Sequence, residues 1–136
     1  MLNPDAFVPY VWQHMPPEIA KPESVTADGR AGVTTTTYRQ LALYAFSQAD
    51  QHLRVRFNIP LPDTVPDGST LQFALSQLIA AYILRRFAAY QALAKDMFAN
   101  AFATLDEWAV QVLQEQDAVA GPTFVEDEFL AEFPEL

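Results

Sequence analysis

Residues 69–87 read STLQFALSQLIAAYILRRF and contain neither proline nor glycine. Ser69 followed three residues later by Gln72 is the pattern of a capping box, which predicts the start of a helix. Apolar residues then cover almost every side of that helix. A helix of this kind lies either at the centre of its fold or at a subunit interface. Gln72, Ser76 and Gln77 interrupt the apolar run, so we expect a buried helix and not a membrane span.

Prolines bound two long stretches, residues 38–59 and 67–121, in which helices can form without interruption. The first stretch predicts a helix of about 20 residues that begins with a capping box at Thr37 and Gln40. The second predicts the helix already described and another from Tyr90 to Glu115. We place the break between them near residues 87–91, because an unbroken helix of about 45 residues would be unusual in a small domain.

Each of the two outer helices has one apolar stripe at helical spacing. In the first helix the stripe is Leu41, Ala45, Ala49 and Leu53. In the last helix it is Tyr90, Leu93, Ala94, Met97, Ala101, Leu105, Trp108 and Val112.

The chain has 136 residues, which fits a single all-α domain built as a small bundle of three main helices. We divide it into an irregular N-terminal segment (1–36), a helical domain (37–116) and an acidic aromatic tail (117–136). Within the N-terminal segment, residues 5–14 predict a short helix interrupted at Pro9.

The tail carries six of the chain's 17 acids and no lysine or arginine, so it holds −6 of the net charge of −9. Phe124, Phe129 and Phe133 alternate with these acids. One interpretation is a frayed, solvated terminus. The other is an arm that folds when it docks, on the same subunit or on a neighbour.

The composition excludes several classes of function. The chain has no cysteine, so disulfide scaffolds, thiol catalysis and cysteine-based metal sites are excluded. Its acidity argues against binding to a nucleic-acid backbone. There is no secretory signal pattern, so we expect a protein of the cytoplasm or of a particle assembled there, without a membrane partner.

Candidate catalytic groups are few, and we expect neither a metal site, a cofactor nor an enzyme. Val55 and Arg56 follow His52 at the positions where a metal site on a helix would need a second ligand. Asp50 and His52 are two residues apart and point to different helix faces. Asp106 and Glu107 are adjacent, so they diverge in the same way.

The segment from Asp50 to Leu61, DQHLRVRFNIPL, has the order acid, leucine, arginine–aromatic and proline–leucine. It continues with Val65-Pro66 and with the central helix. Over residues 38–115 this order resembles the small head–tail connector proteins of tailed phages, including Mu-type virion proteins. His52 and Phe57 stand where tyrosine is common in that family.

The resemblance implies a structural virion protein at the head–tail junction, made in the host cytoplasm. Its partners would be copies of itself in a ring, a dodecamer by the resemblance, the portal protein, and a tail-side stopper or completion protein. The alternatives are a small helical binding module or regulator and, less favoured, an enzyme. The candidate interface residues are Phe73, Leu84, Phe87, Phe124, Phe129 and Phe133.

Overall fold

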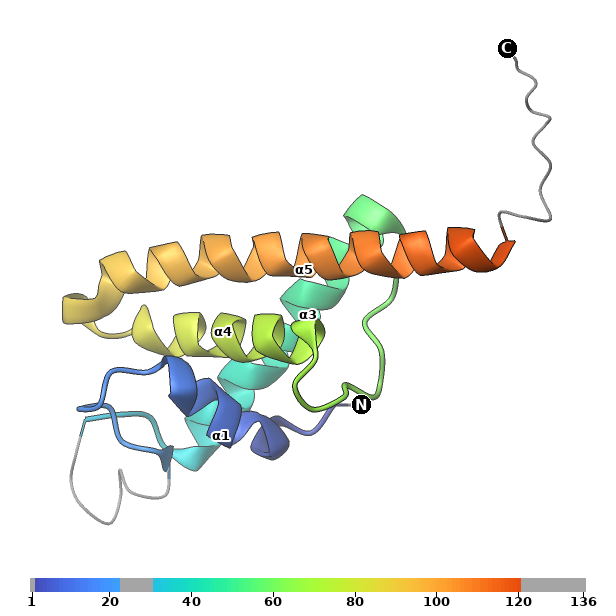
Figure 1. Ribbon diagram of the computed structural model, residues 1–136. Coiled ribbons are helices and arrows are strands. Elements are labelled where there is room, and N and C mark those ends of the chain that lie inside the picture. The colour runs from blue at the N-terminus through green and yellow to red at the C-terminus, as the bar shows by residue number, and fades with distance from the viewer. Residues whose placement is uncertain (1, 23–30, 121–136) are drawn as a thin grey trace.

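The computed structural model describes residues 2–22 and 31–120, with the side chains of the last helix described as far as residue 117. The predicted all-α fold is confirmed: three long helices, α3 (Thr35–Phe57), α4 (Thr70–Leu84) and α5 (Gln91–Ala120), form a small bundle. α4 and α5 run antiparallel, and α3 crosses both of them (Figure 1). The predicted end of the last helix at Glu115 is wrong, because α5 continues to Ala120.

α4 is the central helix, as its apolar sequence predicts. Thirteen of its fifteen residues are buried, because α5, α3 and the N-terminal segment all pack on it. Its predicted cap is also present: Ser69 Oγ accepts a hydrogen bond from Gln72 N at 3.1 Å. Gln72 Oε1 reaches back and accepts from Gly68 N, one residue before the position that the usual capping box uses.

α3 begins earlier than predicted, because its N-cap is Thr34 and not Thr37. Thr34 Oγ1 accepts a hydrogen bond from Thr37 N at 3.2 Å. Four consecutive threonines can each cap a helix, and packing selects among them. α3 ends at Asn58, which has a left-handed backbone with φ +56°, and Asn58 N and Ile59 N donate to Arg54 O and Leu53 O.

The N-terminal segment is part of the same hydrophobic core. It contains three short helical turns, η1 (Pro4–Phe7), α1 (Val8–Val11) and η2 (Trp12–His14). The predicted interruption at Pro9 is wrong, because Pro9 lies in the first turn of α1, where its missing N–H is not needed. Phe7, Val11 and Ile19 are buried with the long helices.

Two hydrogen-bonding contacts fasten this segment to α3. Tyr38 Oη donates to Pro4 O at 2.6 Å, and the Arg39 guanidinium forms two hydrogen bonds with the Asp5 carboxylate. Burial raises the pKa of Tyr38 well above its ordinary value, and the charge of Asp5 adds to this rise. The pKa of Asp5 lies below its ordinary value, chiefly because Arg39 hydrogen-bonds to it.

The turn between α4 and α5 is tight, and its position agrees with the predicted break near residues 87–91. The chain leaves α4 through Arg85 and Arg86, and Phe87 has an extended backbone. A short turn, η3 (Ala88–Tyr90), then leads into α5. Tyr82 and Phe98, one on each helix, pack edge to face at 4.7 Å and join the two helices near this turn.

Candidate functional site

The C-terminal half of α3, which carries the connector-like sequence, presents polar side chains on two faces. On one face, Asp50 holds the proline-rich loop that follows the helix. Its Oδ1 accepts a hydrogen bond from Leu61 N at 2.8 Å, and both carboxylate oxygens accept from Arg54 Nε. We call this arrangement of Asp50, Arg54 and the Leu61 amide the Asp50 clasp.

The environment of Asp50 contains opposing influences on its pKa. Burial by itself raises the pKa of this carboxyl, but the Leu61 N–H and the Arg54 guanidinium both stabilise the charged form. The balance lowers the pKa below its ordinary value. The clasp therefore favours the ionised form of Asp50.

A groove of about 450 Å³ lies beside the Asp50 clasp. Leu2, Leu43, Phe46 and Leu61 supply its apolar walls, and Asp50 and Arg54 form part of its polar edge. Leu43 is 43% exposed, so this apolar surface is open to solvent.

On the second face, His52 of α3 meets Asp106 of α5. Their Nε2 and Oδ1 atoms are 2.7 Å apart, and Arg56 Nε lies 3.6 Å from the same Oδ1. The His52 ring also packs on the Phe102 ring at 4.8 Å between centroids. These contacts join α3 to α5, and the His52 side chain is 19% exposed.

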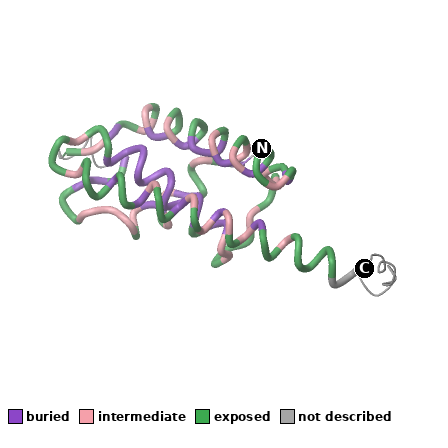
Figure 2. The backbone as a smooth tube through the Cα atoms, turned by 90° about the horizontal axis from the view of Figure 1, so that it is seen from above, coloured by how far each residue is buried: buried purple, intermediate pink, exposed green. Residues whose placement is uncertain are grey.

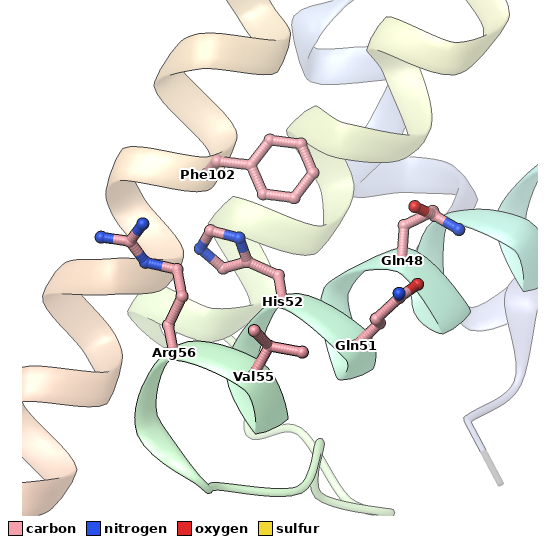
Figure 3. A pocket seen from close by; sticks show the side chains of 6 residues that line it. All are labelled: Gln48, Gln51, His52, Val55, Arg56 and Phe102. Carbon is pink, nitrogen blue, oxygen red and sulfur yellow. The ribbon is translucent and has the colours of Figure 1, made fainter.

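An open groove of about 370 Å³ lies over this contact (Figure 3). Its lining residues are Gln48, Gln51, His52, Val55, Arg56 and Phe102. A histidine paired with an aspartate can act as a general base, but it needs a nucleophile or a bound substrate to act on. The contacts of His52 with Asp106 and Phe102 join two helices, so the arrangement serves as an interhelical clamp with a polar surface above it.

Sequence reasoning rejected a pair of Asp50 and His52, and the structure separates these two side chains onto different faces. It missed Asp106 as the partner of His52, because 54 residues separate the two positions. Asp106 and Glu107 diverge as predicted: Asp106 contacts His52, whereas Glu107 is exposed. Within residues 2–22 and 31–120, no cluster of three or more histidine, aspartate or glutamate side chains could bind a metal ion.

The predicted interface residues have different environments. Phe73 is 48% exposed and rests edge-on against the His14 ring. Phe87 is half-buried at the turn before α5. Leu84 is fully buried in the hydrophobic core, so its assignment to a surface is wrong. Phe124, Phe129 and Phe133 lie outside the described residues.

Several exposed apolar residues were not among the predicted interface residues. Leu93 was expected in the buried stripe of α5, but it is 41% exposed. The buried stripe instead runs through Ala94, Met97, Ala101, Leu105 and Ala109, and Trp108 and Val112 are only half-buried. Val110 and Leu113 lie farther along α5 and are also exposed. The apolar residues on both sides of the α5 stripe were the signal that could have indicated a second contact face.

The chain matches no family model, and no curated protein or solved structure is significantly similar to it. No helix in the described part of the chain is long and apolar enough to cross a bilayer.

Proposed function

We propose that this protein is a structural subunit of a tailed-phage head–tail connector, without enzymatic activity. It forms a ring at the portal vertex and joins the DNA-filled head to the tail. Its neighbours are copies of itself, the portal protein and a tail-side completion or stopper protein. The observation that carries the subunit role is the uncovered apolar surface on the second half of α5.

This surface follows from the lengths of the helices. α5 has 30 residues and α4 has 15, so at about 1.5 Å per residue α5 extends about 22 Å beyond the length that α4 can cover. The C-terminal end of α5 projects from the body, and many of its positions are exposed (Figures 1 and 2). Val110 and Leu113 are 43% and 36% exposed there. These two side chains are three residues apart and therefore adjacent on one helix face, and contiguous exposed apolar side chains are typical of protein contact sites.

The assignment to a phage connector rests on the resemblance over residues 38–115. The structure supports this assignment, because the positions that carry the resemblance act together to hold one loop. Arg54 Nε and the amide of Leu61 in the proline–leucine pair both donate to the Asp50 carboxylate, and Leu53 between Asp50 and Arg54 in sequence is fully buried. These positions hold a loop on a helix, as expected of a structural protein. The acidity of the chain also suits a ring through which DNA slides, because a negative wall repels DNA.

The test is deletion of this gene from the phage or prophage that carries it, followed by electron microscopy of the lysate. We expect filled or leaky heads beside separate, complete tails, and restoration of whole particles when the gene is supplied from a plasmid. Normal infectious particles from the deletion strain would refute the connector function. That result would favour the alternative, a small helical binding module.

A further inference from the structure

The turn between α4 and α5 is the place where unpaired positive charge gathers on this acidic chain. We call the exposed surface of residues 85–95 the basic corner. Of the seven described lysines and arginines, Arg39, Arg54 and Arg56 pair with carboxylates of α3, α5 or the N-terminal segment. Within residues 2–22 and 31–120, no carboxylate pairs with Arg85, Arg86 or Lys95.

The side chains of the basic corner are positioned for a contact. The Arg85 guanidinium stacks over the Tyr82 ring at 4.7 Å and lies 5.6 Å from the Phe98 ring, so its orientation is restricted. Arg86 and Lys95 are exposed. The nearby acids are few: Asp96 follows Lys95 in sequence, and Glu18 is held by a hydrogen bond with Tyr90.

The basic corner also has an apolar component. Phe87 is half-buried, and Ala88, Ala89 and Ala92 are exposed. Ala92 lies three residues before Lys95 on α5 and therefore shares its face of the helix. A surface that combines uncompensated cations with exposed apolar groups is complementary to a segment in which acids alternate with aromatic residues. The end of this chain contains such a segment: residues 124–128 read FVEDE.

We propose that residues 124–128 of one copy bind the basic corner of a second copy, so that successive copies join head to tail. Glu126, Asp127 and Glu128 pair with Arg86 and Lys95, and Phe124 packs against Phe87 and Ala92. This contact is heterologous, and such contacts generate closed rings when the rotation between copies closes. The inference deepens the proposed function by specifying how the subunits of the ring are joined.

The length of α5 decides between a contact within one copy and a contact between two. Ala92 and Ala120 are separated by 28 residues of one helix, or about 42 Å. Phe124 lies four residues beyond Ala120, and four extended residues span at most about 14 Å. Phe124 therefore cannot reach the basic corner of its own copy, and its partner must be a neighbour.

A charge-exchange experiment with full-length proteins tests this contact. The corner variant carries Arg86→Glu and Lys95→Glu, and the tail variant carries Glu126→Lys and Glu128→Lys. Each variant alone presents like charges at both sides of the contact, so we expect each to sediment as a smaller species than the wild type. Their equimolar mixture presents opposite charges at every contact, and we expect association to return in sedimentation velocity.

A milder pair of variants controls for net charge. We expect Arg86→Gln with Lys95→Gln to weaken wild-type self-association about tenfold, the size expected when two screened ion pairs are lost. Thr36→Glu with Gln40→Glu changes the net charge by the same −2 at exposed positions of α3, outside both the basic corner and the apolar surface of α5, and it should leave association unchanged. All variants should keep the helical circular-dichroism signal, because the altered side chains are exposed or lie beyond α5.

Three results would overturn the inference. They are equal association of the corner and wild-type proteins, failure of the mixture to associate, and a wild type that stays monomeric up to about millimolar concentration, since specific contacts bind more tightly than that. The gene-deletion test is independent of these. If gene deletion leaves phage heads and phage tails unjoined but the charge variants do not alter self-association, this contact is wrong and the connector function stands. If the charge variants behave as expected but the deletion strain makes normal particles, the contact stands and the connector function is wrong.

Discussion

Removing the carboxylate of Asp50 should destabilise the protein, because this one group fixes both a helix side chain and a loop amide. Asp50→Ala loses the hydrogen bond from Leu61 N at 2.8 Å, a bond to a charged acceptor that contributes about 1.5–3 kcal/mol. It also loses the pair with Arg54, whose side chain is 59% exposed, and such a pair contributes less than about 1 kcal/mol. The expected loss is about 2–3 kcal/mol.

The assay is urea denaturation followed by helical circular dichroism at pH 7. With a denaturant slope of about 1.5 kcal/mol/M for a chain of this size, the midpoint should fall by about 1–2 M. Asp50→Asn keeps a neutral acceptor for the Leu61 amide, so about 1 kcal/mol should be lost. Arg54→Gln is the matched control: it removes the exposed pair, retains the loop hydrogen bond, and should cost less than about 1 kcal/mol.

The pH dependence follows from the depressed pKa of Asp50. A carboxyl whose pKa is lower in the folded protein adds stability above its unfolded pKa and loses it as the pH falls through the folded pKa. The difference between wild type and Asp50→Ala should therefore be constant from pH 7 to about pH 5 and shrink below the ordinary value of 3.8. An Asp50→Ala protein as stable as wild type at pH 7, or a difference that grows with acid, would refute the reasoning.

Three further substitutions test the packing. Leu78→Asp places a charge at a fully buried position of α4 and should abolish the cooperative unfolding transition in circular dichroism. Phe73→Asp, at a half-exposed position of the same helix, is the control and should fold. A stable Leu78→Asp protein would contradict the burial of this position. Ser76→Ala should change the free energy of unfolding by between zero and about +1 kcal/mol, because the buried Ser76 Oγ forms no hydrogen bond with any described group. A clear loss of stability in urea denaturation would reveal a partner for it. Tyr38→Phe removes the hydrogen bond to Pro4 O and should cost about 1 kcal/mol in the same assay, and an unchanged midpoint would show that this bond does not hold the N-terminal segment.

The sequence by itself determined the features that depend on local spacing. Helix capping, the absence of proline and apolar periodicity act over a few residues, so the three helices and the cap at Ser69 could be read directly. For α4 the sequence left two options, the centre of the fold or a subunit interface, because a helix that is apolar on nearly every side must be covered on every side. The same reasoning predicted that only one face of α3 and one face of α5 would be covered. The buried residues Ala49, Leu53, Ala101 and Leu105 lie on those faces.

Tertiary structure alone decided which distant groups meet and which apolar residues remain uncovered. His52 and Asp106 are 54 residues apart, and Tyr38 and Pro4 are 34 apart, so no local spacing links them. Leu84 is covered and Leu93 is exposed, although both are leucines near the same turn. Periodicity shows which residues share a helix face. The lengths and crossing of neighbouring helices determine how much of that face another helix covers.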